Sequence, residues 1–244
     1  MDIQDADNFS TIARPLVADG YVFTHADDMR PVLERAGLTD WQGFAASWND
    51  LGQDGYMADG GRYRQRRHAA FSVAGAAIRR KPHQPHYQSR DYNALNGGIA
   101  RWFDPVTEVI AAHPAMTAIL STCAALFDGV TPAAIRPPSW HVEVHQFRIE
   151  PTENGIGKPT PEGMHRDGVD WVLVLLIGRK NIVSGVTSIH DALRAPVGEF
   201  TLIEPMDAAF VDDGRVYHGV TAIKAEDPGK PAFRDVLVVT FRHE

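Results

Sequence analysis

The sequence has almost no cysteine and no long apolar run, and each absence excludes a class of protein. Cys123 is the single cysteine among 244 residues, so a disulfide framework and a thiolate-rich metal site are both excluded. It stands in an apolar run, which predicts a buried small side chain. No apolar stretch is long enough to cross a bilayer. The opening residues MDIQDADNFS are too acidic and polar for a secretory signal, so we expect a cytoplasmic protein with no membrane partner.

An excess of positive charge is missing as well. The chain has 24 lysines and arginines against 31 acidic residues, a net charge of -7, which argues against a nucleic-acid partner and leaves a small molecule as the expected one. One local basic group remains. We expect its members to be solvated or paired with acids, the alternative being an anionic ligand. The group comprises Arg62, Arg64, Arg66, Arg67, Arg79, Arg80 and Lys81.

The first half of the chain has helical and loop character. Apolar residues recur at helical spacing over 27–36, and a second helical stretch covers 104–129 with a break at Pro114. The polar, aromatic-bearing segment 83–103 between them predicts a surface loop that is long enough to cover another part of the molecule.

The second half changes to short apolar segments separated by glycine, proline and aspartate turns. These segments are 140–149, 169–177, 181–189, 200–203, 208–211, 216–223 and 236–241. Short strands at regular spacing predict a double-stranded β-helix, or jelly roll, of roughly eight strands. We therefore expect one α+β, mainly β domain over 1–244. In it, 139–244 supply most of the jelly-roll core, and 1–138 supply helical, loop-rich support packed on one sheet.

With so little cysteine, a transition-metal site must use histidine and carboxylate ligands. In a strand, residues two apart point to the same face and can chelate one ion. Three pairs have this spacing: His25/Asp27, His141/Glu143 and His165/Asp167. The first opens a predicted helix, where such positions diverge. The second lies in a strand with no complementary sequence nearby, and we interpret it as one face of a sheet.

The third pair stands at the mouth of a predicted strand. Gly168 follows it directly and permits a tight change of direction. A third ligand comes from His218, which begins a later strand after an Asp-Asp-Gly turn. Two histidines and one carboxylate, His165, Asp167 and His218, leave three coordination positions open, which is the facial triad of non-heme iron oxygenases.

An arginine further along fits the same interpretation. Arg234 opens the strand RDVLVVTFR, which in a barrel would neighbour the strand that carries His218. Its guanidinium could pair bidentately with the far end of a dicarboxylate. Arg242 shares the strand parity but lies at the far end, so it is the second choice.

Three segments carry a resemblance: PEGMHRDGVDWVLVLLIGRKNIVSGVTSIHD, FVDDGRVYHGVTAI and RDVLVVTF. They resemble the 2OG-Fe dioxygenase family of bacterial free amino-acid hydroxylases, of the L-isoleucine 4-hydroxylase type, which also includes biofilm-, stress- and motility-linked proteins. The resemblance runs from YNALNGG to the C-terminus. It implies a jelly roll with Fe(II) at His165, Asp167 and His218, the distal carboxylate of 2-oxoglutarate on Arg234, and O2 as the oxidant.

The resemblance also implies the reaction, which is hydroxylation of an aliphatic C–H bond of a free L-amino acid or a similar small molecule. Asp167 is retained, which favours hydroxylation over halogenation. Two alternatives stay open: a jelly-roll metalloenzyme that does not use 2-oxoglutarate, and a small-molecule sensor that keeps the fold.

The substrate-binding residues are not fixed by the sequence. Chain order alone offers His145, Gln146, Arg148, Asp170 and the segment Tyr87 to Arg101. In the strand 140–149, one phase turns His141, Glu143, His145 and Phe147 inward and the other turns Gln146 and Arg148 inward, and a one-residue register error exchanges the two sets. The loop Pro151 to Met164 is a candidate lid, with an ordinary surface loop as the alternative. The oligomeric state is not predicted.

Overall fold

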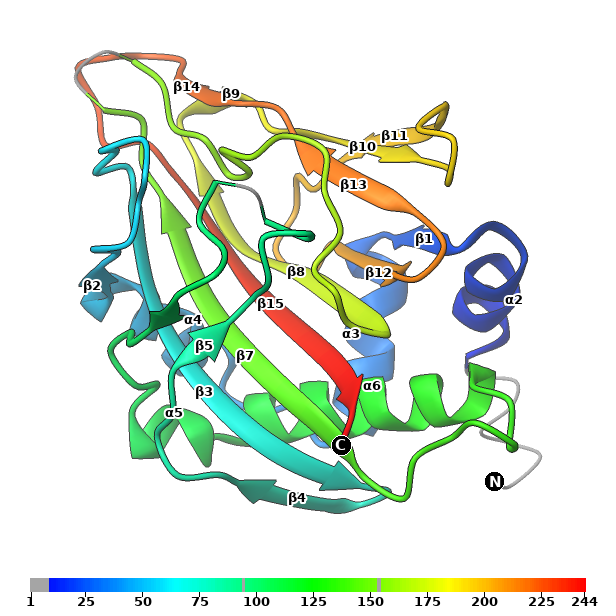
Figure 1. Ribbon diagram of the computed structural model, residues 1–244. Helices are drawn as coiled ribbons and strands as arrows, with labels where there is room; N and C mark the ends of the chain where they lie inside the picture. Colours follow the sequence, from blue (N-terminus) through cyan, green and yellow to red (C-terminus); the bar gives the residue numbers. More distant parts are fainter. Residues whose placement is uncertain (1–8, 94, 153–154) are drawn as a thin grey trace.

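A large antiparallel sheet runs through the molecule, and it draws strands from both halves of the chain (Figure 1). The computed structural model describes residues 9–93, 95–152 and 155–244. The strand order is β1-β12-β8-β15-β7-β3-β2, with β4 paired to β3. The strands are β1 (Tyr21–Thr24), β2 (Gly52–Gln53), β3 (Arg64–Ala74), β4 (Ala77–Arg80), β7 (Trp140–Ile149), β8 (Trp171–Lys180), β12 (Ala208–Asp212) and β15 (Phe233–His243).

A smaller sheet of order β11-β10-β13 faces the larger one. Val172 of β8, Ile189 of β10 and Val211 of β12 pack together between the two layers. The remaining strands form two short pairs, β9 with β14 and β5 with β6. The bounds are β5 (His86–Tyr87), β6 (Ala100–Arg101), β9 (Ile182–Ser184), β10 (Val186–His190), β11 (Pro196–Thr201), β13 (Tyr217–Val220) and β14 (Ile223–Ala225). The predicted jelly-roll class is confirmed.

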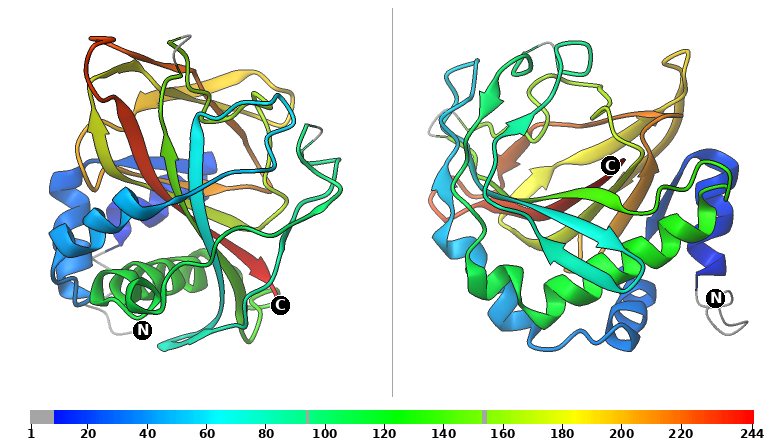
Figure 2. Two further views of the ribbon diagram at one scale, coloured as in Figure 1. Left: turned by 90° about the vertical axis from the view of Figure 1, so that its left-hand side faces the viewer. Right: turned by 60° about the horizontal axis from the view of Figure 1, so that its bottom comes forward.

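The helices gather on one side, against the outer face of the large sheet (Figure 2), as the sequence predicts. They are α2 (Ser10–Asp19), α3 (Ala26–Arg35), α4 (Trp41–Ala46), the 3-10 turn η1 (Ser47–Asp50), α5 (Glu108–Ala111) and α6 (Pro114–Val130). The predicted break at Pro114 is confirmed, because α6 begins at that residue, where the missing N–H of proline is tolerated. No helix among the described residues is long and apolar enough to span a membrane.

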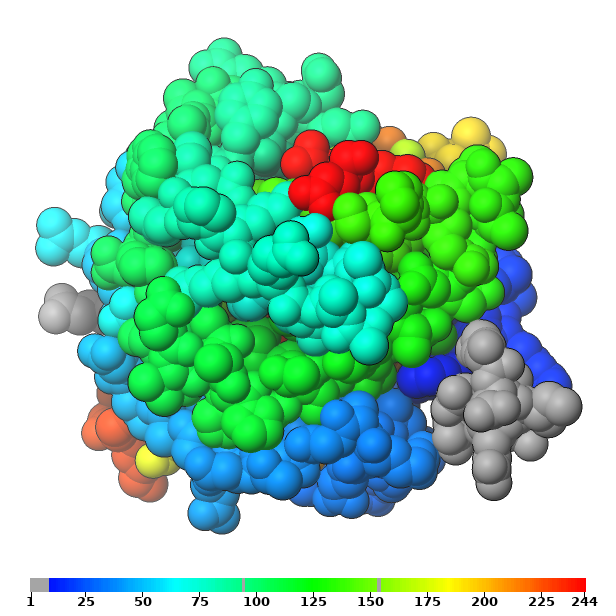
Figure 3. Space-filling model, turned by 90° about the horizontal axis from the view of Figure 1, so that it is seen from below, coloured from blue at the N-terminus to red at the C-terminus, as the bar shows by residue number. Residues whose placement is uncertain are grey.

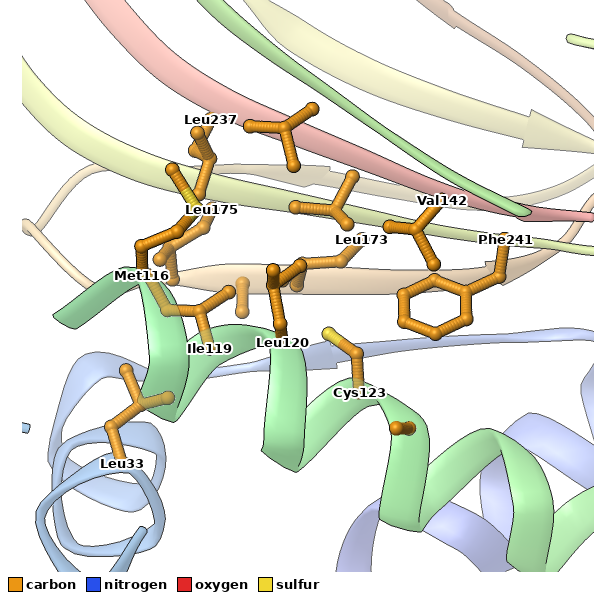
Figure 4. Close-up of a cluster of buried hydrophobic side chains, with 14 of the residues drawn as sticks. Leu33, Met116, Ile119, Leu120, Cys123, Val142, Leu173, Leu175, Leu237 and Phe241 are labelled. Atoms are coloured by element: carbon orange, nitrogen blue, oxygen red, sulfur yellow. The ribbon is translucent and has the colours of Figure 1, made fainter. Parts of the chain in front are cut away.

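The hydrophobic core lies between α6 and the large sheet. Figure 4 shows Ile119, Leu120 and Cys123 of α6 against Leu173 of β8 and Phe241 of β15. Burying each such aliphatic or aromatic side chain stabilises the fold by roughly 1.5–3 kcal/mol. Burial raises the pKa of the Cys123 thiol, which agrees with its prediction as an inert core residue. Since strand side chains alternate, the opposite faces of the same strands are left to line a cavity between the sheets.

The strand β3 differs from the prediction of loop and helix in the first half. It is 11 residues long and pairs with β7, with His68 opposite His145. Its cavity-facing residues are polar, among them Arg64, Arg66 and His68, so no apolar alternation marks the segment as a strand. Because its cavity-facing residues are polar, this long strand of the sheet could not be recognised from hydropathy.

The lower face of the molecule is built mainly by the first half of the chain. Figure 3 shows the β3–β4 hairpin, α6 and the α3 region side by side, with the C-terminal residues reaching the surface beside the hairpin. Glu244 forms an ion pair with Lys81 there and accepts hydrogen bonds from Ser72 (2.9 Å) and Ser139 (2.7 Å). These contacts tie the end of β15 to the neighbouring strands.

Candidate metal centre and its cavity

His165, Asp167 and His218, the residues of the predicted triad, come together at one point of the cavity wall. His165 and His218 form an isolated antiparallel pair, in which each backbone N–H donates to the other carbonyl at 2.9 and 3.0 Å. The pairing places their rings 4.5 Å apart between centroids. The Nε2 atoms of His165 and His218 lie 3.5 and 3.6 Å from the two carboxylate oxygens of Asp167.

The spacing and orientation of these donors suit one ion. Atoms bound at about 2.1 Å to a common ion lie roughly 3.0–3.5 Å from one another, close to the separations observed here. His165 Nδ1–H donates to the Gly163 carbonyl at 3.0 Å, which leaves Nε2 free as a ligand. His218 is buried, and its Nδ1 has no hydrogen-bond partner among the described residues.

The backbone around Asp167 is held by a second aspartate. The carboxylate of Asp213 accepts hydrogen bonds from the N–H groups of Asp167 (2.9 Å), Gly168 (2.7 Å) and Val169 (3.1 Å). Gly168 has a φ of +80°, and a Cβ there would lie 2.5 Å from the ring of Tyr92. The turn thus requires glycine both for its backbone conformation and for the close approach of Tyr92.

The charges at this point balance one another. Burial raises the pKa of Asp167, but the hydrogen bond and charge of His165, with the charge of His218, outweigh it and hold the pKa below its ordinary value. Burial lowers the pKa of His165, but Asp167 outweighs it and raises the pKa to about 9. Burial and the charge of His165 lower the pKa of His218 to about 4. A divalent cation bound here would take the place of the proton on His165.

Arg234 points into the same cavity from the start of β15. Its side chain is 2% exposed, and its Nε and Nη2 have no hydrogen-bond partner among the described residues. Burial and the charge of Arg179 lower its pKa to about 10. A buried guanidinium without an acidic partner is unfavourable until an anion pairs with it. Arg242, the second choice, is exposed at the far end of the strand.

The cavity has an apolar wall and a polar wall. Val172 and Val174 of β8 and Val236 and Val238 of β15 contribute to the apolar side. The polar side is built by Arg64, Arg66, His86, Gln88, Asn93, Arg101 and His145, with Glu162 and the triad at one end. A largely apolar hollow with a few converging polar groups is typical of a small-molecule site.

Of the four substrate candidates named from the sequence, the structure brings His145 to the cavity. The cavity-facing phase of β7 is that of His141, Glu143, His145 and Phe147. The amide of Gln146 donates instead to Ser47 Oγ (2.9 Å), and Arg148 pairs with Asp235 (2.7 Å). Asp170 accepts a hydrogen bond from the backbone N–H of His243 at 2.8 Å, away from the cavity.

Glu143 has partners that the sequence interpretation missed. Four imidazoles surround its carboxylate: His86 Nδ1 at 2.5 Å, His141 Nε2 at 3.4 Å, His145 Nε2 at 3.5 Å and His68 Nε2 at 3.7 Å. His68, His86, Glu143 and His145 form a second group of metal-ligand type, which we call the Glu143 group. His141 and Glu143 lie on one face of β7, as interpreted, but Glu143 also has partners on other strands. Its partners come from β3 and β5, far away in the sequence, so local spacing could not reveal them.

The segment 83–103 covers the triad, as its length predicts. Gln88 Nε2 donates to the backbone carbonyl of Asp167 at 3.1 Å, and Tyr92 lies against Gly168. Arg101 lines the cavity from the same segment, and sequence reasoning named it only as the end of a range. In the basic group, Arg64 is paired with Asp54 at 2.7 Å, as expected, but the pair is buried rather than solvated.

The candidate lid Pro151 to Met164 is described only in part, because residues 153–154 lie outside the described ranges. Pro159, Thr160 and Glu162 of this loop line the cavity. Glu162 has one carboxylate oxygen 3.6 Å from His165 Nε2 and the other buried without a hydrogen-bond partner. Its role as a lid stays a prediction.

The proteins that the chain resembles include two curated relatives and one protein of known structure. It is 28% identical to a 3(1)-hydroxy-L-isoleucine 4-dioxygenase of Pantoea ananatis and 26% identical to an L-isoleucine-4-hydroxylase of Bacillus thuringiensis, over 65% of this chain in both cases. The chain spans less than two thirds of these relatives, 64% of the first and 65% of the second. The crystal structure of a bsmA homolog from Methylobium petroleophilum PM1 matches with a TM-score of 0.86 at 34% identity, covering 96% of this chain and 92% of that one.

The family model described as 2OG-Fe dioxygenase matches residues 45–240. This range contains the triad, Arg234, the Glu143 group and most strands of both layers of the jelly roll. The chain therefore belongs to the 2OG-Fe dioxygenase family.

Proposed function

We propose that this protein is an Fe(II)- and 2-oxoglutarate-dependent dioxygenase that hydroxylates an aliphatic C–H bond of a free L-amino acid or a similar small molecule. Membership of the family implies Fe(II), 2-oxoglutarate and O2. One observation carries the assignment to residues: the triad and the unpartnered guanidinium of Arg234 share a single cavity. The substrate class is supported by the activities named for the two relatives, both of which act on isoleucine or its derivative.

In this proposal, His165, Asp167 and His218 hold the iron through two nitrogens and one oxygen. Three protein donors would leave room at the ion for small ligands. The bound iron supplies O2 activation and C–H oxidation. The protein supplies orientation: the Gly163 carbonyl fixes the ring of His165, and Asp213 fixes the backbone of Asp167.

Arg234 then binds the distal carboxylate of 2-oxoglutarate. Its guanidinium offers two parallel N–H donors, which match a carboxylate geometrically. The valine side chains of β8 and β15 keep the surrounding volume apolar and exclude water from the reacting groups. Exposed Arg242 has no access to this volume, which favours Arg234 for the role. The cytoplasmic location stays a prediction from composition.

The experiment that tests the proposal is an anaerobic titration of the Fe(II) protein with 2-oxoglutarate, followed by visible absorption. We expect the weak charge-transfer band of the chelate in the wild type and in Arg242→Ala, and no band in His218→Ala. Iron that binds without any band in the wild type would leave a 2-oxoglutarate-independent metalloprotein or a sensor as the function.

A further inference from the structure

Arg101 is a second buried guanidinium of the cavity that has no acidic partner. It lies on β6, its side chain is 2% exposed, and its Nε has no hydrogen-bond partner among the described residues. Its one side-chain hydrogen bond to the described residues, from a terminal nitrogen to Gln88 Oε1, is 3.5 Å long, at the limit for such a bond. By contrast, Arg64 and Arg66 lie 2.7 and 3.6 Å from the carboxylate of Asp54.

A charge buried in this way destabilises the protein unless a ligand neutralises it. Burial and the charge of Arg64 lower the pKa of Arg101, and the charges of Asp54, Glu162 and Glu143, none of which forms an ion pair with it among the described residues, offset this only in part. The proposed co-substrate does not account for it. One carboxylate of 2-oxoglutarate belongs at the metal and the other at Arg234, so no anionic group of 2-oxoglutarate remains for Arg101. A different anion is needed.

Arg101 is also close to the proposed metal site. The side chain of Gln88 bridges the two, because its amide nitrogen donates to the Asp167 carbonyl while its oxygen accepts from Arg101. An anion on Arg101 is therefore held beside the metal ligands, where a substrate must lie.

The same cavity offers a free acceptor of opposite charge. Glu162 Oε2 is buried and has no hydrogen-bond partner among the described residues. Both Glu162 and Arg101 line the cavity. A ligand that carries a carboxylate and an ammonium group would satisfy both side chains at once, whereas a simple monocarboxylate would satisfy only Arg101.

We propose that Arg101 binds the α-carboxylate of the substrate and that Glu162 accepts a hydrogen bond from its ammonium group, so that the site selects zwitterionic free amino acids. This inference rests on the proposed function and assigns the substrate-binding residues that the sequence left open. Anchoring both charged ends leaves the side chain of the amino acid for the apolar wall of the cavity.

The test measures amino-acid binding apart from turnover. The Fe(II)–2-oxoglutarate complex is titrated anaerobically with each of the twenty free L-amino acids, and a shift of its visible band reports binding. For the tightest binder, the carboxamide and the des-amino acid are then titrated in the same way. We expect the carboxamide and the des-amino acid to bind more weakly than the amino acid itself.

Arg101→Gln is the principal variant, with Arg67→Gln as its matched control. Arg67 lies on β3 and pairs with Asp50 at the surface. We expect Arg101→Gln to weaken amino-acid binding by roughly 10- to 100-fold, the worth of charge-assisted hydrogen bonds, with the 2-oxoglutarate affinity unchanged. Arg67→Gln should bind both ligands like the wild type. Glu162→Gln should reduce the preference for the amino acid over its des-amino analogue.

Three results would overturn the inference. The first is wild-type amino-acid affinity in Arg101→Gln, and the second is a loss of 2-oxoglutarate affinity in its place. The third is the absence of a response to any of the twenty amino acids while the 2-oxoglutarate band is present, which refutes the substrate class and leaves the proposed co-substrate chemistry standing. The melting temperature distinguishes a structural role of Arg101 from a role in substrate binding. It should not fall in Arg101→Gln, because an unpaired buried charge is removed, and a marked fall would assign Arg101 to the fold.

Discussion

Two carboxylates, Asp167 and Glu143, are surrounded by imidazoles, yet their surroundings differ in ways that bear on metal binding. Asp167 faces two rings, and its backbone is held by Asp213. Glu143 faces four rings, one of them at 2.5 Å, which is the length of a direct hydrogen bond and too short for two ligands of one ion. A cation also stands close to Glu143, because Arg66 contacts His145 Nδ1 at 2.6 Å.

The comparison teaches that ligand residue types do not define a metal site by themselves. The Arg66 guanidinium, held 3.6 and 4.3 Å from the ring centroids of Phe103 and Phe147, adds positive charge where a divalent ion would have to enter. Burial raises the pKa of Glu143, but its histidine partners outweigh this and hold the pKa far below the ordinary value. We therefore interpret the Glu143 group as an ordered polar cluster and keep the triad as the proposed metal site.

The largest expected effect separates the two groups directly. His218→Ala removes one of three metal donors, so we expect loss of stoichiometric iron and of succinate formation, with the fold retained. Glu143→Gln should keep one iron per chain. Metal analysis of both purified variants, with circular dichroism to check the fold, makes the comparison. The opposite pattern, with iron lost only in Glu143→Gln, would move the metal to the Glu143 group.

A smaller effect is expected on the co-substrate side of the triad. Arg234→Ala removes the charged partner of the distal carboxylate, which should weaken 2-oxoglutarate binding by ~1.5–3 kcal/mol. Arg242→Ala, on the same strand but exposed, is the matched control and should bind normally. Calorimetric titration with 2-oxoglutarate checks both variants. If Arg234→Ala binds as tightly as the wild type, Arg234 does not bind the distal carboxylate.

The backbone anchoring of Asp167 can be tested at Gly168. A side chain there adopts a positive φ and also collides with Tyr92, whereas Gly75 has a φ of +55° with nothing within 4 Å of an added Cβ. Gly75→Ala should therefore be destabilised only by the strain of a left-handed backbone, which lowers the unfolding free energy by roughly 1–2 kcal/mol. We expect Gly168→Ala to lose more and also to bind iron more weakly. Urea unfolding measures the difference, and equal losses would show that Tyr92 moves aside freely.

What the sequence allowed us to predict depends on how far apart the interacting residues lie. His165 and Asp167 are two residues apart at the mouth of a strongly apolar strand, and β8 and β15 carry almost continuous apolar runs, so the pair and the strands could be predicted from local sequence. His68 meets His145 only through the pairing of β3 with β7, and a polar strand gives no hydropathy signal. Arg101 lies beyond a long loop, and nothing in its local sequence separates it from a surface arginine.

The smallest expected effect is on the pH dependence of the unfolding free energy, and it comes from His68 of the Glu143 group. Burial lowers the pKa of His68 below its ordinary value of 6.5, so the stabilisation from its neutral form is present above about pH 6.5 and is lost as the pH falls. His243 shows the opposite shift: its hydrogen bond with Asp170 raises its pKa, so its contribution is complete below pH 6.5 and is lost as the pH rises. As the pH falls from 7 to 5, the unfolding free energy of His68→Leu should therefore rise relative to that of the wild type. Over the same range, the unfolding free energy of His243→Gln should fall relative to that of the wild type. Urea unfolding across this range compares the three proteins. Parallel curves for wild type and His68→Leu would mean that folding does not lower the pKa of His68.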